Sequence, residues 1–336
     1  MAAYHSKSVK LTVTAVSDSM VDLIVGTVAT CHGESSMAQN IVIGTVCNNI
    51  LLILGTCFLA AGIRQFESLF NYQAASTRSA LLNLSMAFLL IVYTMDRFSR
   101  LEVGQPDLLA PISSGISVVL VILYILYIFF RYRTHAGLYD DYWVDDYQPD
   151  IPDVAGLLVT DADARRRDRG SPGDEGLSRE DDPRLGYLTA SLFVLLSTTL
   201  MVLVADSVVT RIPLTGATTA RFYGLFVVPI CLKSALHGEV IYNALTGKME
   251  STLATTTDGA LRTMYLLYPM LIFLSRILGY PMNMVFELDE LIVTFLATFV
   301  LAPIAARGSS TFLDGALILL IGLIVYLEQY IRLVNV

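Results

Sequence analysis

The sequence predicts an all-α integral membrane protein with about nine transmembrane helices. Of its 336 residues, 54% are hydrophobic and only 15% are charged, an excess that a soluble protein of this length does not need to bury a full core. Apolar segments of about 20 residues, the length that crosses a bilayer, recur along the chain. The charge is concentrated, because 131–184 contains 14 of the 30 acidic residues. We therefore expect the lipid bilayer to surround most of the chain.

Four candidate spans precede this charged segment and five follow it. Long apolar runs without alternating polar residues favour helices over the strands of a membrane barrel. The two clearest spans carry no charged residue, whereas ionisable residues interrupt the first, sixth and seventh. The candidates are 9–30, 38–63, 79–95, 111–130, 187–205, 222–245, 251–275, 289–306 and 312–331.

The charged segment divides the chain into three parts. We expect membrane repeats at 1–130 and 187–336, with an acidic loop at 131–186 between them. Gly, Pro, Asp and Arg dominate the loop, so we expect it to be largely disordered. With nine spans, Lys and Arg residues are more numerous on the side of the N-terminus, which predicts that the N-terminus and the loop are cytosolic.

The same sequence argues against several other classes of protein. A net charge of −8 does not favour nucleic-acid binding through basic charge. The sequence has no P-loop, G-x-S-x-G or H-E-x-x-H motif. We therefore expect neither an enzyme nor a bound cofactor, and the sequence makes no prediction about the oligomeric state.

Four segments resemble one family of membrane transporters. Residues 44–71, GTVCNNILLILGTCFLAAGIRQFESLFN, are similar to the first-repeat core of the vacuolar cation/proton exchangers, the CAX family. That core is roughly G-S-x-x-S-N-x-L-L-x-L-G-x-C-F-x-x-G-G-x-R, followed by E-Q-x-F. The preceding stretch, 17–34, resembles the family's G-N-A-V-E-L-I-V-G segment. In the second half, 222–250 and 255–287 resemble the corresponding segments, with differences at functional positions.

The resemblance implies an architecture and an activity. Family members have two inverted repeats of five helices, usually after an additional helix, with an acidic segment between the repeats. Such repeats place the substrate site near the bilayer midplane, between discontinuous helices. Here the second repeat has five candidate helices and the first has four, so we expect a divergent, N-terminally shortened, fungal-type member. The implied function is calcium/proton antiport from the cytosol into the vacuole or another internal compartment.

Acidic residues in the first span are candidates for the cation site, because charges inside a membrane are costly and often functional. Asp18 and Asp22 share a helix face, and two carboxylates suit a hard cation such as calcium. By the resemblance, Asp22 falls on the family's essential glutamate and Ser19 on its asparagine. Thr45 and Asn49 fall on the family's serine and asparagine. We predict Asp22 and Asn49 as the main ligands of transported calcium, unless 9–30 is not fully inserted and its acids meet water.

The second half departs from the family pattern where the resemblance places the matching ligands. Leu236 stands at the second essential glutamate, Lys233 at the asparagine and Arg262 at the glutamine. One anionic ligand is therefore lost, and two cations are added near the expected ion path.

The new charges have possible partners within the spans. Asp258 and Arg262 are four residues apart, in the order that favours pairing within one helix. We expect that pair to form, which leaves Lys233 to meet Asp18 or Asp22. Such a pair would put a fixed ammonium group where a cation would otherwise bind.

Two further polar residues follow Lys233. Glu239 lies three residues after Leu236 and is a candidate to replace the missing carboxylate in part. His237 falls on the family histidine, and it either carries a proton or senses pH, or is a packed, hydrogen-bonded residue. Three hypotheses for function remain: a cation antiporter, a transport-inactive or regulatory relative whose cation site is closed by Lys233 and Arg262, and a transporter of altered selectivity.

Overall fold

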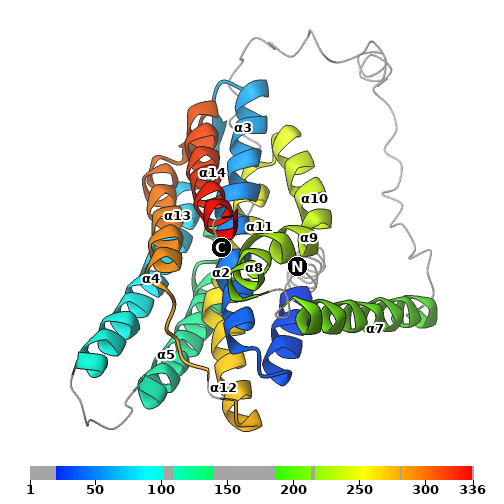
Figure 1. Ribbon diagram of the computed structural model, residues 1–336. Helices are drawn as coiled ribbons and strands as arrows, with labels where there is room; N and C mark the ends of the chain where they lie inside the picture. The colour runs from blue at the N-terminus through cyan, green and yellow to red at the C-terminus, as the bar shows by residue number, and fades with distance from the viewer. Residues whose placement is uncertain (1–19, 102–108, 140–186, 213–215, 281, 335–336) are drawn as a thin grey trace, which may run out of the picture.

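The computed structural model describes residues 20–101, 109–139, 187–212, 216–280 and 282–334. Within these ranges the chain is mostly helical, and most of the long helices run roughly alongside one another (Figure 1). The expected loop lies outside the described residues from residue 140 to residue 186, as do the side chains of 187–198.

In the first half, the described chain begins with a short apolar helix, Met20–Cys31. One long span then contains a segment of π-helix between two α-helices, and two further spans follow. The elements are α2 (Ser35–Cys47), η1 (Asn48–Leu54), α3 (Gly55–Arg64), β1 (Ser68–Leu69), α4 (Tyr72–Leu101), α5 (Leu109–Phe129), η2 (Phe130–Thr134) and η3 (Ala136–Tyr139).

In the second half, two of the apolar paths also contain π-helix. The elements are α7 (Tyr187–Arg211), α8 (Ala217–Phe222), η7 (Tyr223–Val227), α9 (Val228–Leu232), α10 (Ser234–Leu245), α11 (Met249–Arg262), η8 (Thr263–Leu267), α12 (Tyr268–Leu278), α13 (Leu288–Arg307), β2 (Ser309–Ser310) and α14 (Phe312–Val334).

Six helices in the described ranges are long and apolar enough to cross a membrane, or seven if a bent pair in 218–245 counts as one span. These correspond to seven of the nine predicted spans. Of the predicted span 9–30, the structure describes only the helix Met20–Cys31. The predicted span at 187–205 belongs to α7, which lies across the other long helices in Figure 1. The number nine therefore stays a prediction.

The two halves of the chain interleave rather than forming separate bodies. First-half elements pack on second-half elements throughout: α3 on α14, α4 on α13, α5 on α12, α2 on η7 and η1 on α11. Strands β1 and β2 add a short antiparallel connection, in which Ser68 pairs with Ser310 and Leu69 with Ser309. Residues predicted for one site but carried by different halves can therefore meet in the interior.

Glycines allow this close packing. A Cβ added to Gly44 would lie 2.2 Å from the carbonyl oxygen of Leu225. Between α3 and α14, a Cβ on Gly62 would lie 2.4 Å from the amide nitrogen of Phe312. These neighbours are backbone atoms, which cannot rotate away as side chains can.

Candidate cation-binding site

Lys233 lies at a break in a helix. It separates α9 from α10, and the two parts of this path, Thr218–Leu232 and Leu236–Leu245, are bent by 62° relative to each other. The path also contains η7, followed by Pro229, which cannot donate a backbone hydrogen bond. Broken helices and π-helical turns occur often at functional sites of membrane transporters.

Asp22 and Lys233 form a buried ion pair. The Nζ of Lys233 lies 2.8 Å from the Oδ2 of Asp22, and their side chains are 4% and 2% exposed. An unpaired charge deep in a membrane costs at least about 2.5–3.5 kcal/mol, so each group stabilises the charged form of the other. Lys233 thus has one of the two partners expected from the sequence, and Asp18 lies outside the described residues.

Several buried polar atoms in this region have no hydrogen-bond partner among the described residues. They are Oδ1 of Asp22, Oγ1 of Thr45, Oδ1 of Asn48, and both side-chain polar atoms of Asn49. The last three residues lie at the junction of α2 with η1. Buried polar atoms are usually satisfied, so these atoms are the candidates in this region to bind water or an ion.

Asn49 and Arg262 both lie close to Gly259. The position that a Cβ of Gly259 would take is 3.1 Å from Nδ2 of Asn49 and 4.0 Å from Nη2 of Arg262. The guanidinium of Arg262 is also within electrostatic range of Asp22. The structure therefore brings Asp22 and Asn49 of the first half near Lys233 and Arg262 of the second.

Asn48 is a residue of the site that was not predicted from the sequence. Its Nδ2 lies 3.2 Å from Nε2 of His237, so the amide donates and the imidazole accepts through that nitrogen. His237 is half-buried on α10, one turn after Lys233. Two successive amides inside an apolar span, Asn48 and Asn49, were the available signal.

Asp258 does not pair with Arg262 as expected. Its carboxylate accepts a hydrogen bond of 2.7 Å from the hydroxyl of Tyr127 and forms ion pairs with Arg131 and Arg78, the latter at 3.5 Å. These partners come from α4, α5 and η2, which pack against the side of α11 that carries Asp258. Both arginines flank predicted spans in the sequence and therefore resembled ordinary charges at helix ends.

Three other residues were predicted for the site. Glu239 is exposed on α10, and Leu236 is partly buried against the hydrophobic core. Ser19 lies outside the described residues. In the described chain, no group of three or more His, Cys, Asp or Glu side chains is arranged to hold a metal ion. The described part of the site therefore offers one carboxylate, Asp22, together with neutral oxygens.

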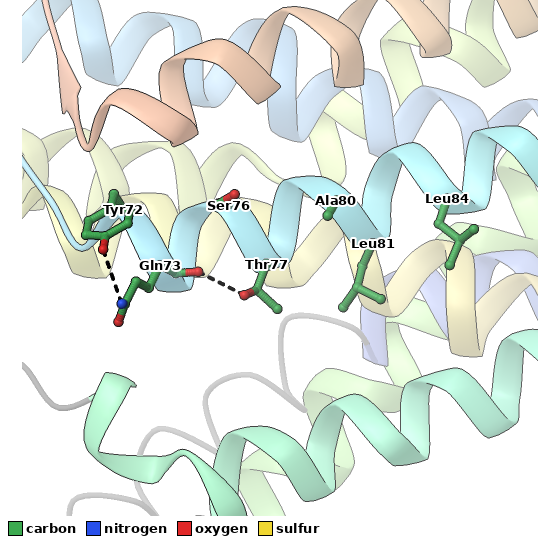
Figure 2. A pocket seen from close by; sticks show the side chains of 7 residues that line it. All are labelled: Tyr72, Gln73, Ser76, Thr77, Ala80, Leu81 and Leu84. Carbon is green, nitrogen blue, oxygen red and sulfur yellow. Dashed lines mark hydrogen bonds between the residues drawn. The ribbon is translucent and has the colours of Figure 1, made fainter.

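A surface cavity is separate from this cluster. It has a volume of about 540 Å³ and lies along the first half of α4 (Figure 2). Its lining changes from hydroxyl and amide groups at the start of the helix to apolar groups further along, and it shares no residue with the candidate site. The lining residues are Tyr72, Gln73, Ser76, Thr77, Ala80, Leu81 and Leu84.

Known proteins resemble this chain over most of its length. A family model described as "Sodium/calcium exchanger protein" matches residues 4–133. The "Vacuolar calcium ion transporter" of Schizosaccharomyces pombe is 26% identical over 92% of this chain and 68% of its own. The "Vacuolar cation/proton exchanger 1b" of Oryza sativa subsp. japonica is 24% identical over 95% of this chain and 67% of its own.

Solved structures share the fold. Native YfkE superposes with a TM-score of 0.71 at 19% identity, covering 95% of this chain and 83% of the other. A structure described as an H⁺/Ca²⁺ exchanger CAX gives 0.58 at 12% identity, covering 93% and 74%. The matching family model and the named relatives are membrane exchangers rather than enzymes. The sodium/calcium exchanger model covers the first part of the chain, and the resemblance to the vacuolar cation/proton exchangers, seen in the sequence, is confirmed over most of its length.

Proposed function

We propose that this chain is a cation/proton antiporter that moves calcium out of the cytosol, into the vacuole or another internal compartment. The observation that carries the proposal is the buried Asp22 carboxylate, whose free oxygen lies in the same interior as the unpartnered oxygens of Thr45 and Asn49. Carboxylate and neutral oxygens are the ligands that calcium prefers. The names of the relatives in fungi and plants support calcium and the vacuole.

The exchange would be a competition for the same group. A proton and a calcium ion each neutralise the Asp22 carboxylate, so binding of one disfavours binding of the other. The Lys233 ammonium holds one oxygen of that carboxylate at 2.8 Å. An incoming cation must therefore share Asp22 with Lys233 or displace it. We also propose that 1–130 and 187–336 are the two inverted repeats, which their interleaved packing supports.

Calcium uptake into sealed vesicles tests this function. Purified protein is reconstituted and a proton gradient, acid inside, is imposed. We expect uptake that collapses with the gradient and that Asp22→Asn reduces to the level of empty vesicles. The matched control is Glu67→Gln, which neutralises an exposed carboxylate between α3 and β1. Equal uptake by wild type and Asp22→Asn would refute the role of Asp22.

The Asp22–Lys233 pair favours a second candidate function, a relative that does not transport. In this hypothesis Lys233 and Arg262 neutralise the site permanently, and the protein acts through partners rather than by moving ions. Wild-type uptake equal to that of empty vesicles, in protein that is folded by gel filtration, would support it. Proton-driven uptake by the wild type would exclude it.

A further inference from the structure

A second group of buried charges shares helix α11 with the candidate cation site. The side chains of Arg78, Arg131 and Asp258 are only 2%, 11% and 10% exposed. Arg78 also forms an ion pair of 3.2 Å with Glu250, near the start of α11. Two arginines thus face two carboxylates, so the group is balanced in charge. We call Arg78, Tyr127, Arg131, Glu250 and Asp258 the charge clasp.

One side of the clasp reaches the segment that leads into 140–186. Arg131 lies in η2, and the ring of Tyr139, at the end of η3, lies 5.2 Å from the guanidinium carbon of Arg78 and 5.4 Å from that of Arg131. Asn71 makes a further connection. Its backbone N–H donates a hydrogen bond of 2.8 Å to the carboxylate of Glu250, and its side-chain Nδ2 donates one of 2.6 Å to the carbonyl oxygen of Leu138. Residues 131–139 are therefore held against α4 and α11 by several contacts.

The other side of the clasp reaches the candidate site. Asp258 immediately precedes Gly259, which packs against Asn49, and it lies one helical turn before Arg262. An α-helix transmits displacement over one turn because its backbone hydrogen bonds connect residues four apart. A shift of Asp258 would therefore move the backbone that faces Asn49 and the guanidinium that faces Asp22.

We propose that the charge clasp couples the segment 131–139 to the candidate cation site. Asp258 is a positioning residue that sets where α11 presents Gly259 and Arg262, and Arg131 is the connection through which the segment acts on it. If a rearrangement of the segment withdraws Arg131, Asp258 keeps only one of its two arginine partners. Helix α11 then shifts so that the Asp258 carboxylate can pair with another group. By reciprocity, a change at the site alters the segment. The coupling does not depend on which ion the site binds.

The single tryptophan of the chain, Trp143, provides a reporter four residues after Tyr139. Its emission and its quenching by acrylamide are measured in detergent for the wild type and for Arg262→Gln, without added ions. The same comparison is made with Arg131→Gln present. The matched control is Arg133→Gln, which removes an exposed arginine of the same segment. Gel filtration verifies that each variant is folded.

We expect Arg262→Gln to change the Trp143 signal by more than the difference between Arg133→Gln and the wild type. The change should persist in the Arg133→Gln background and disappear in the Arg131→Gln background.

If Arg131→Gln does not fold, Tyr127→Phe replaces it, since this variant removes the 2.7 Å hydrogen bond to Asp258 and keeps every charge. In the Tyr127→Phe background, the change that Arg262→Gln causes in the Trp143 signal should be smaller than in the wild-type background. The proposal would be overturned if Arg262→Gln left the Trp143 signal unchanged in the otherwise wild-type protein. It would also be overturned if Arg262→Gln changed the signal equally in all backgrounds. Because no ion is added, this outcome is independent of the uptake assay.

Discussion

Asp22 and Lys233 show how a single substitution changes a membrane interior. Where the related family has an asparagine, this chain has an ammonium group, and the structure pairs it with the buried carboxylate at 2.8 Å. A bound cation and a fixed ammonium satisfy a carboxylate by the same electrostatics, but the ammonium does not dissociate. In the proposed antiporter, the free Oδ1 of Asp22 is the oxygen that remains for an exchanged ion.

Removing the ammonium alone should destabilise the protein. Lys233→Asn leaves Asp22 buried without its partner, and breaking a buried pair in this way costs about 3–5 kcal/mol. We expect a clear fall in the thermal unfolding midpoint in detergent. Arg307→Gln is the control, because it breaks the pair with Asp314 at a side chain that is 52% exposed. Equal midpoints for the two variants would contradict a strong pairing at Lys233.

At the scale of single residues, the sequence predicted Asp18 or Asp22 as the partner of Lys233, because buried charges in apolar spans need partners, and the structure shows the pair with Asp22. It assigned Asp258 to Arg262 by their spacing within one helix, and this was wrong. The true partners, Arg78 and Arg131, are distant in sequence and become neighbours only when α4 and η2 pack on α11. Spacing along one helix carries no information about such contacts.

At the scale of elements, the helix pair α3 and α14 depends on the absence of side chains at their contact. A Cβ on Gly315 would lie 2.3 Å from the amide nitrogen of Leu59, and one on Gly62 would meet the backbone of Phe312. The contact is therefore between main chains, and neither helix can give way without moving as a whole.

Gly315→Ala should separate these helices and lower the unfolding midpoint, since overpacking of this kind costs about 1–3 kcal/mol. The matched control is Gly115→Ala in α5, where no heavy atom lies within 4 Å of the new Cβ. That change should be neutral or slightly stabilising, because alanine favours a helix over glycine. A Gly315→Ala protein as stable as the Gly115→Ala protein would show that the α3–α14 contact is looser than described.

The extent of most elements could be predicted, but their internal form could not. The apolar run 251–275 corresponds to the span Met249–Leu278, and 289–306 to Leu288–Arg307, because length and hydropathy alone define a span. The π-helical turn in η8 and the 62° bend around Lys233 have no such signal. Hydropathy is an average over a whole span and does not report such local changes of helix geometry.

At the scale of the whole molecule, the interleaving of the two halves brings residues together that are about 200 positions apart. The distribution of Lys and Arg in the sequence predicts on which side of the membrane the acidic segment 131–186 lies. The sidedness of transport follows from the same prediction, because the antiporter proposal requires calcium to leave the compartment that contains this segment.

Trypsin accessibility checks this orientation. The sequence ARRRDRG at 164–170 offers several cleavage sites in the segment. On sealed vacuolar vesicles with the cytosolic face outward, we expect cleavage there without detergent, followed by recovery of two membrane fragments. Cleavage that appears only after permeabilisation would place the segment in the lumen and reverse the proposed direction of transport.

The central claim is that Asp22 is the position of the exchanged cation and that Lys233 competes for it. The most direct test compares proton-driven calcium uptake by the wild type with that of a triple variant, Lys233→Asn, Leu236→Glu and Arg262→Gln. These changes remove both cations and restore the second carboxylate of the family pattern. We predict uptake by the triple variant well above that of the wild type, and its loss when Asp22→Asn is added. Equal uptake by the wild type and the triple variant would contradict the competition by Lys233.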